Sequence, residues 1–342
     1  MSSAMGVSEM ADETALRGKT MKALVQEGRG SADVLHLRDV PVPEVTEGRV
    51  LVRMRAASVN ALDWHSTHGG LILEIAAKVM RSKDEPVRGV DLAGTVEAVG
   101  KEVKQFKPGD EVFGLMLGYR GGFAEYVCAP EKVLALKPAS LTFEEAAVFP
   151  QAAVIALQGI RDKGQVQPGQ KVLINGAGGG AGSFAVQLAK LYGAEVTGVD
   201  NTGKLDFMRS LGADHVIDYT REDFTKNGKQ YDMILDVIAH RSVFAYKRAL
   251  RPNGSCFMVG GSVATAFQIL LLGPWVRRTA GKKIRLLVVQ PNRKDLVFIT
   301  ELCEAGKVVP VIDRRYPLRE VPEALRYLGE GHAKGKIVIT VE

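Results

Sequence analysis

Hydrophobic and polar residues follow one pattern in the first part of the chain. Between Met21 and Pro150, short apolar segments show alternation or β-branched residues, and turn sequences such as Pro108-Gly109-Asp110 separate them. The segments with this pattern are 21–25, 49–56, 94–100 and 111–114. Alternation with a period of two is typical of strands that bury one face, so the pattern predicts an antiparallel, barrel-like β domain.

The pattern changes after Pro150, where strand-like segments alternate with helical ones. The apolar segments that we interpret as strands are 171–175, 195–199, 215–219, 233–237, 255–259 and 284–289. Between them, 183–191 and 204–211 have helical spacing, and Gly212 ends the second of these helices. Such alternation is typical of a parallel sheet. The last segment, 336–341, has no helix after it, and we expect it to return to the first domain.

A glycine-rich turn follows the first strand of the second part. The apolar residues 171–175 lead into Gly176–Gly182, and a helix begins directly afterwards. Strand, glycine turn and helix open a nucleotide-binding βαβ unit, in which the backbone approaches a pyrophosphate and the helix offers free N–H groups. The residues that we expect to contact a dinucleotide here are Gly176, Ala177, Gly179, Gly180, Ala181 and Gly182.

Composition and charge exclude several other classes of protein. The chain has 342 residues, of which 46% are apolar and 25% charged, as in ordinary globular proteins. Its net charge is +6, but we interpret the basic residues as scattered, which favours a small anionic ligand and predicts no nucleic-acid partner. Three isolated cysteines, Cys128, Cys256 and Cys303, favour a reducing compartment and no structural zinc site.

The chain contains no predicted targeting or membrane-spanning segment. Residues 1–20 are partly acidic and have no apolar core, so we expect a disordered tail and a cytoplasmic protein. The longest apolar segment, 267–276, contains Gly273-Pro274 and is shorter than the roughly 18 residues that a membrane span needs. We interpret this segment as a cover over the active-site cleft.

Four motifs together resemble those of the medium-chain dehydrogenase/reductase superfamily, in its zinc-independent quinone oxidoreductase and enone reductase branch. They are Ala57–Asp63, Gly89–Gly94, Gly176–Gly182 and Ser210–Asp214, and the resemblance covers residues 21–342. It implies an α/β fold with a GroES-like β-barrel catalytic domain, 21–150 and 291–342, and a doubly wound Rossmann domain, 151–290. It also implies a homodimer in which the strand 284–289 pairs with its copy.

The resemblance bears on metal binding. Zinc alcohol dehydrogenases of the same superfamily have their zinc ligands at positions that match Asn60, Val90 and Gln151, and none of these side chains is a thiolate or an imidazole. His65 and His68 lie three residues apart without a third ligand. We therefore expect no metal, and a zinc-type alcohol dehydrogenase is the least supported alternative.

Residues after the second and third strands bear on the choice of cofactor. Asp200, taken alone, favours NADH, because an acidic residue here accepts hydrogen bonds from the ribose and repels a 2′-phosphate. Lys204 and Tyr219 match positions that contact the 2′-phosphate in the quinone oxidoreductases. We predict NADPH, with NADH as the alternative. At the nicotinamide end we expect contacts from Val237, Gly260, Gly261 and Lys336.

The residue types predict that the cofactor carries most of the chemistry. No Ser-His-Asp set or pair of carboxylates is evident, and reduction of a quinone or an α,β-unsaturated carbonyl compound needs no strong acid. Asn60 is the expected donor to the developing oxyanion or to the nicotinamide ribose, and Asp63 is expected to orient Asn60 or a nearby backbone group. Tyr119 is a further candidate donor. An enoyl-thioester reductase is a variant of this hypothesis. The alternative from another class is a redox sensor that binds NADPH with little turnover.

Overall fold

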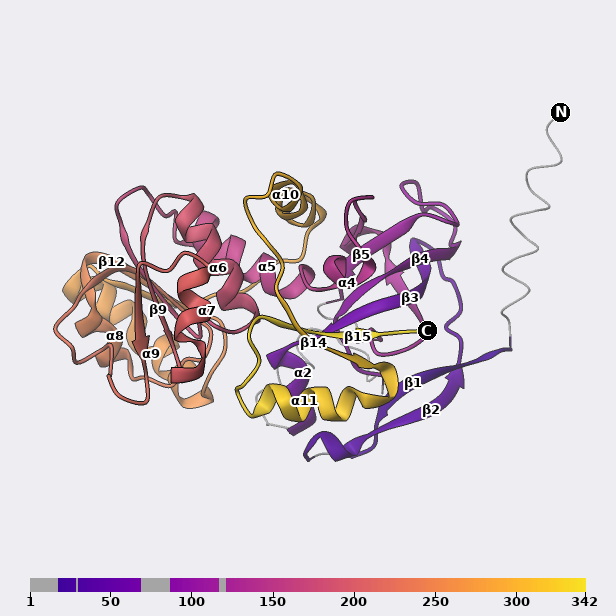
Figure 1. The fold of residues 1–342 in the computed structure, drawn as a ribbon, viewed down its shortest axis with the longest axis horizontal. Helices are drawn as coiled ribbons and strands as arrows, with labels where there is room; N and C mark the ends of the chain where they lie inside the picture. The colour runs from indigo at the N-terminus through magenta and orange to yellow at the C-terminus, as the bar shows by residue number, and fades with distance from the viewer. Residues whose placement is uncertain (1–17, 29, 69–86, 117–120) are drawn as a thin grey trace.

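The computed structural model describes residues 18–28, 30–68, 87–116 and 121–342, and it has two bodies side by side (Figure 1). One body contains the glycine turn, and the other is rich in antiparallel strands. The predicted tail up to Arg17 and the candidate donor Tyr119 lie outside the described residues.

The first body is built on a six-stranded parallel sheet. Its strands are β8 (Lys171–Asn175), β9 (Glu195–Asp200), β10 (His215–Asp218), β11 (Tyr231–Asp236), β12 (Leu250–Met258) and β13 (Lys283–Leu286). Their spatial order is β10-β9-β8-β11-β12-β13, so the chain reverses direction across the sheet between β8 and β11. This is the order of a doubly wound dinucleotide-binding sheet, with its ligand crevice at the carboxyl ends of β8 and β11.

Helices connect these strands, as the alternation predicts. They are α6 (Gly180–Leu191), α7 (Leu205–Ser210), α8 (Val243–Ala249) and α9 (Val263–Ala280). The edge strand β13 is shorter than the predicted 284–289. Beyond Leu287, the N–H of Gln290 donates to the side chain of Gln158 instead of pairing with β12, and this ends the strand.

The second body holds the β domain. A two-stranded sheet, β1 (Thr20–Gln26) and β2 (Leu35–Pro41), lies beside a sheet of order β14-β15-β3-β4-β5-β7, with β6 paired to β3. The strands of this second sheet are β3 (Arg49–Val59), β4 (Asp91–Val99), β5 (Glu111–Leu115), β6 (Tyr126–Pro130), β7 (Leu134–Leu136), β14 (Ile312–Pro317) and β15 (Lys336–Thr340). Neighbours are antiparallel except β14 and β15, and β15 pairs with β3. The chain therefore returns to the first domain, as expected.

Short helices complete the second body and the connection to the first. They are α2 (Ala61–His68), α4 (Phe143–Ala147), α5 (Pro150–Leu157), α10 (Arg293–Glu304) and α11 (Val321–Gly329). The arrangement agrees with the GroES-like plus Rossmann architecture. The domain limits at residues 150/151 and 290/291 remain our proposal.

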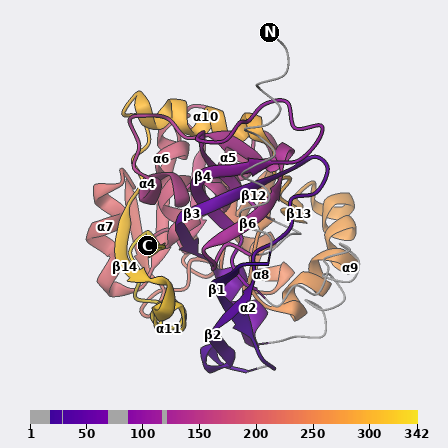
Figure 2. The same ribbon diagram turned by 90° about the vertical axis from the view of Figure 1, so that its right-hand side faces the viewer.

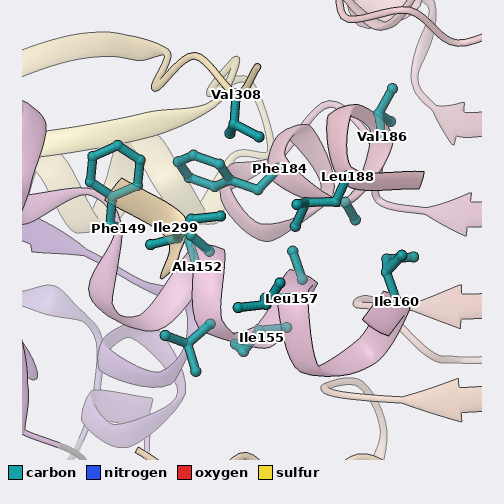
Figure 3. Close-up of a cluster of buried hydrophobic side chains, with 14 of the residues drawn as sticks. Phe149, Ala152, Ile155, Leu157, Ile160, Phe184, Val186, Leu188, Ile299 and Val308 are labelled. Atoms are coloured by element: carbon teal, nitrogen blue, oxygen red, sulfur yellow. The ribbon is translucent and has the colours of Figure 1, made fainter. Parts of the chain in front are cut away.

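The main core lies along α5, between the two bodies (Figure 1). Seven of the eight residues of α5 are buried, because its sequence is apolar on all sides. Just before α5, the ring of Phe149 lies 5.5 Å from that of Phe184 on α6, and Figure 3 shows Ile299 of α10 beside them. The helix that begins the dinucleotide-binding part is thus fixed by elements from both parts of the chain.

The apolar segment 267–276 lies within one continuous helix, α9, which runs through Gly273 and Pro274. A Cβ on Gly273 would lie 2.7 Å from the carbonyl oxygen of Ile284, so α9 packs directly on the backbone of β13. Figure 2 shows α7 and α9 on opposite sides of the molecule. A role for α9 as a cover over the cleft stays a prediction. Among the described residues, no helix has the length and apolarity required to span a bilayer.

Candidate active site

The glycine turn is tight because backbone groups occupy the space of side chains. Gly176 has a φ of +81°, and its N–H and that of Ala177 donate to the carbonyl oxygen of Val199. A Cβ on Gly182 would lie 2.0 Å from the carbonyl oxygen of Gly176. Gly179 precedes α6 with no side chain capping the helix, so the N–H groups of its first turn are available to an anion.

Two lysine side chains flank this turn. A Cβ on Gly178 would lie 2.6 Å from Cδ of Lys204, and a Cβ on Gly180 would lie 2.7 Å from Cδ of Lys336. Both lysines are buried. The absence of side chains at the two glycines therefore leaves room for two cations beside the helix N-terminus. We call the glycine turn together with Lys204 and Lys336 the cradle, and its positive charge fits the phosphates of a dinucleotide.

Asp200, Lys204 and Tyr219, the residues expected to bear on the choice of cofactor, lie together at one corner of the turn. The Asp200 carboxylate is buried, accepts hydrogen bonds from the N–H groups of Gly178 (3.0 Å) and Asn201 (2.9 Å), and lies 3.4 Å from the ammonium of Lys204. The N–H of Tyr219 donates to the carbonyl oxygen of Asp200, and the residue is 52% exposed. The carboxylate of Asp200 therefore points into the protein and is paired with the ammonium of Lys204.

The loop after β11 is held by Asp236, the residue before the expected nicotinamide contact Val237. Its carboxylate accepts hydrogen bonds from Asn175 Nδ2 (2.9 Å), the hydroxyl of Tyr246 (2.8 Å) and the N–H of Ile238 (3.0 Å). Burial raises the pKa of Asp236 and of Tyr246. This network fixes the loop after β11 against the glycine turn.

Val237, Gly260 and Gly261, the expected nicotinamide contacts, lie beside this network. A Cβ on Gly176 would lie 2.6 Å from Cγ2 of Val237, so Val237 packs directly on the turn. Gly261 has a φ of +114°, and a Cβ there would lie 1.9 Å from the carbonyl oxygen of Ala239. The loops after β11 and β12 therefore approach each other through backbone alone, at the edge of the sheet where such folds bind ligands.

Asn60, Asp63 and Lys336 form one buried polar cluster, together with two residues that sequence reasoning missed, Ser58 and Asp91. The ammonium of Lys336 donates to Asn60 Oδ1 at 2.6 Å and to the carbonyl oxygen of Val59 at 3.1 Å. It lies 3.6 Å from the carboxylate of Asp91. Lys336 of β15 is thus a buried cation beside the glycine turn, and Val59 of β3, Asn60 and Asp91 of β4 hold it there.

Asp91 is the acceptor at the centre of this cluster. Its Oδ2 accepts hydrogen bonds from the Ser58 hydroxyl (2.5 Å) and from Asn60 Nδ2 (2.8 Å), and its Oδ1 accepts the N–H of Gln151 (2.9 Å). Because Gln151 lies in the first turn of α5, Asp91 also caps that helix. The signal in the sequence is the motif Gly89–Gly94, in which the carboxylate of Asp91 directly follows the zinc-ligand position Val90.

Burial changes the protonation equilibria of the cluster. It raises the pKa of Asp63 to about 7, with a further contribution from the negative charge of Asp91. Burial also raises the pKa of Asp91, opposed by Lys336, Ser58 and Asn60, and it lowers the pKa of Lys336. Asp63 Oδ2 accepts the N–H of Asn60, so this carboxyl orients the turn that carries Asn60, as the sequence predicts.

The three positions that match zinc ligands lie near this cluster without forming a metal site. Val90 is apolar and buried, Asn60 binds Lys336, and Gln151 contributes its N–H to Asp91. The side-chain oxygen of Gln151 is buried and has no hydrogen-bond partner among the described residues. Across the same residues, no group of three or more His, Cys, Asp and Glu side chains is placed to hold a metal ion.

Backbone contacts connect the cluster to the turn across the two bodies. The N–H of Gly335, the residue before β15, donates to the carbonyl oxygen of Gly178 at 3.0 Å, and Gly335 forms a bridge with Gly179. The strand that carries Lys336 therefore begins at the dinucleotide turn. The glycine turn and the Asn60–Asp91 cluster therefore lie next to each other where the two bodies meet.

Comparison with known proteins identifies the family. The model of the alcohol dehydrogenase GroES-like domain matches residues 46–139, and that of the zinc-binding dehydrogenase matches residues 211–339. The 2-methylene-furan-3-one reductase of Solanum lycopersicum is 36% identical over 331 residues, which cover 93% of this chain and 79% of the relative. This chain belongs to the medium-chain dehydrogenase/reductase superfamily. The resemblance seen in the sequence is confirmed.

Other members of the superfamily agree over the whole chain. The chloroplastic NADPH-dependent alkenal/one oxidoreductase of Arabidopsis thaliana is 34% identical, covering 94% of this chain and 80% of the relative. The structure of the quinone oxidoreductase from Coxiella burnetii matches with a TM-score of 0.85 at 29% identity, covering 95% of this chain and 100% of the other. The predicted fold class, a GroES-like domain with a Rossmann domain, is confirmed.

Proposed function

We propose that the protein is an NADPH-dependent oxidoreductase that transfers hydride to a quinone or an α,β-unsaturated carbonyl compound without a metal. The proposal rests mainly on the contacts of Lys336. Its side chain packs against the glycine turn expected to bind a dinucleotide, and its ammonium binds Asn60 in a buried cluster that contains no thiolate or imidazole group. NADPH, when bound, supplies the hydride, and the protein supplies position and charge.

The geometry of Asp200 supports NADPH. An acidic residue at this position excludes a 2′-phosphate when its charge faces the ribose. Here the carboxylate is bonded to the N–H groups of Gly178 and Asn201 and paired with Lys204, so its repulsion of a phosphate is reduced. Lys204 and the half-exposed Tyr219 then remain the proposed contacts of the 2′-phosphate. The name of the Arabidopsis relative specifies NADPH.

In the substrate half of the crevice, we assign Asn60 the positioning of Lys336. Both N–H groups of the Asn60 amide already donate, one to Asp91 and one to the carbonyl oxygen of Ser58. Donation to a substrate oxygen, the role predicted from the sequence, requires one of these bonds to break. The buried ammonium of Lys336 instead offers a fixed positive charge beside the turn.

The substrate class is supported by the names of the relatives and by the site, where the described residues offer no group of His, Cys, Asp and Glu that could hold a metal ion. The tomato relative is named for reduction of a 2-methylene-furan-3-one, whose exocyclic double bond is conjugated to a ketone, and the Coxiella structure is named a quinone oxidoreductase. An enolate or hydroquinone anion is delocalised and takes its proton from water. Neither product needs a zinc ion or a Tyr–Lys pair to stabilise an alkoxide.

The test is oxidation of NADPH and NADH with a panel of quinones, enones and saturated ketones, after treatment of the protein with a chelator. The proposal predicts saturable turnover with quinones or enones that chelation does not reduce. Lys204→Ala should raise KM for NADPH and leave KM for NADH unchanged. Turnover restricted to saturated ketones, and restored by zinc, would contradict it. Tight NADPH binding without turnover of any acceptor would favour the redox-sensor alternative.

Two finer features belong to the same proposal. We propose a homodimer, supported by the position of β13 at the edge of the six-stranded sheet, where β12 is its one strand neighbour among the described residues. Light scattering at micromolar concentration should give twice the mass of the chain, and a monomer would refute the dimer. A cytoplasmic location is also proposed, and fractionation of cells that produce the protein would test it.

A further inference from the structure

The outward face of α9 is apolar, contrary to the usual pattern of a surface helix. Its exposed residues include Phe267 (61%), Leu270 (62%) and Leu271 (62%), while Ile269 and Val276 are buried on the other side. Val263 and Trp275 are each 48% exposed. These exposed positions recur at intervals of three and four residues, so they lie on one face. An exposed apolar surface of this kind marks an interaction site.

Basic residues continue the same face at the end of the helix. Arg277 and Arg278 follow Leu270 and Leu271 by seven residues, two helical turns, and both are exposed. On the neighbouring α8, the ring of Phe244 lies 6.3 Å from that of Trp275, and the ammonium of Lys247 lies 5.2 Å from the Trp275 ring. Aromatic, aliphatic and cationic groups therefore share one surface formed by α8 and α9.

The segment that contains this surface is more basic than the total charge of the chain indicates. The 58 residues 237–294 contain 11 Lys and Arg and no Asp or Glu. The other 284 residues contain 34 Lys and Arg against 39 Asp and Glu. The segment that forms α8, α9 and β13 is thus strongly cationic within a chain that is otherwise slightly anionic. For the exposed α8–α9 surface, this charge favours an anionic partner.

We infer that the α8–α9 surface docks on an anionic lipid bilayer. Leucine, phenylalanine and tryptophan on one helical face insert at the boundary between headgroups and acyl chains, and adjacent arginines bind anionic headgroups. A second copy is disfavoured as the occupant, because a two-fold contact through this face would bring Arg277 and Arg278 toward like charges, with no acidic residue in the segment to pair with them. The docking does not depend on the proposed reaction.

Co-sedimentation with unilamellar vesicles tests the inference. The full chain should bind vesicles of phosphatidylcholine and phosphatidylglycerol, and not vesicles of phosphatidylcholine alone. High ionic strength should weaken the binding. The chain has two tryptophans, and Trp64 packs against Gly329, so Trp275 should give the blue shift of emission that accompanies binding. Trp275→Phe should remove this shift.

Paired variants give the sharper test. Phe267→Ser/Leu271→Ser should lose vesicle binding, whereas Leu136→Ser/Val309→Ser, which changes residues of similar exposure elsewhere, should bind like the wild type. Arg277→Gln/Arg278→Gln should lower the partition coefficient about thirtyfold, since each arginine near an anionic surface contributes about fivefold. Lys107→Gln/Lys226→Gln, two exposed lysines elsewhere, is the control.

Three results would overturn the inference. The first is absence of binding to the anionic vesicles, and the second is binding that the Arg277/Arg278 variant leaves unchanged. The third is conversion of a dimer into a monomer by Phe267→Ser/Leu271→Ser, with the fold intact by circular dichroism, which would make the face a contact between copies. The arginine variant keeps the test decisive if the serine variant does not fold.

Discussion

The ammonium of Lys336 lies 2.6 Å from the amide oxygen of Asn60, although the two residues are 276 positions apart in the chain. The same side chain passes so close to Gly180 that a Cβ there would contact its Cδ. One lysine thus touches both the dinucleotide turn and the buried Asn60–Asp91 cluster. Any substitution that moves it should affect both halves of the crevice.

Lys336→Met should destabilise the protein by about 3–5 kcal/mol at neutral pH, because Asp91 then remains buried without the cation that lies 3.6 Å away. Urea denaturation would measure the change in the free energy of unfolding. NADPH binding, followed by fluorescence, should weaken as well. The matched control is Lys334→Met, at an exposed position two residues earlier. Equal stability of the two variants would show that Lys336 does not compensate the charge of Asp91.

Asp63→Asn should change how stability depends on pH. The folded-state pKa of Asp63 is raised to about 7, so between the ordinary carboxyl range and pH 7 the folded protein binds more protons than the unfolded chain. The free energy of unfolding therefore falls as pH rises through this window, by at most about 1.4 kcal/mol per pH unit for one proton. Above pH 7 this contribution is constant.

The asparagine variant should remove this part of the slope, since its amide oxygen can still accept the N–H of Asn60. Urea denaturation at several pH values between 4 and 7, each about one unit apart, would measure the slope of the free energy of unfolding against pH. Asp206→Asn, at a side chain that is 98% exposed, is the control and should keep the slope of the wild type. A slope unchanged in Asp63→Asn would mean that Asp63 titrates in its ordinary range.

The elements of the six-stranded sheet could be predicted because their residues are consecutive and strongly patterned. The sequence 171–191 contains a buried strand, the glycine turn and a helix in direct succession. The strand β2 was missed, because it pairs only with β1 and most of its side chains are not buried, which removes the alternation. The short strand β7 has only three residues, too few to show a period.

The sequence indicates which residues belong to the candidate site better than it indicates which of them are in contact. Asn60 and Lys336 were both named from the sequence, but their contact depends on the pairing of Ile337 with Val59 in the register of β15 and β3. Nothing in the pattern of either strand specifies that register. The inward orientation of Asp200 depends likewise on a side-chain rotation toward Gly178 that residue type does not determine.

Tyr246→Phe should lower stability by about 1–3 kcal/mol, because the buried carboxylate of Asp236 loses the hydroxyl donor that lies 2.8 Å away. Thermal and urea denaturation would measure this loss. Tyr219→Phe, at a half-exposed ring, should leave stability unchanged within the error of the measurement. A stability of Tyr246→Phe equal to that of the wild type would contradict the role of Tyr246 in fixing the loop after β11.

Two glycines of the turn should respond differently to alanine. Gly182→Ala should prevent or strongly impair folding, since its Cβ would lie 2.0 Å from the carbonyl oxygen of Gly176. Gly179→Ala should fold with nearly wild-type stability, because the nearest atom to its Cβ lies at 3.4 Å, but it should bind NADPH more weakly at the obstructed turn. Melting curves and NADPH titrations separate the two effects. Identical melting temperatures would contradict the geometry of the turn.

Transfer of deuterium from NADPH labelled at C4 of the dihydronicotinamide tests the central claim most directly. With an enone as acceptor, the account predicts a saturated ketone that carries one deuterium on the carbon β to the carbonyl, detected by mass spectrometry and NMR. The same product should form in the presence of a chelator. Deuterium on the carbonyl carbon of an allylic alcohol, formed only with added zinc, would contradict the account.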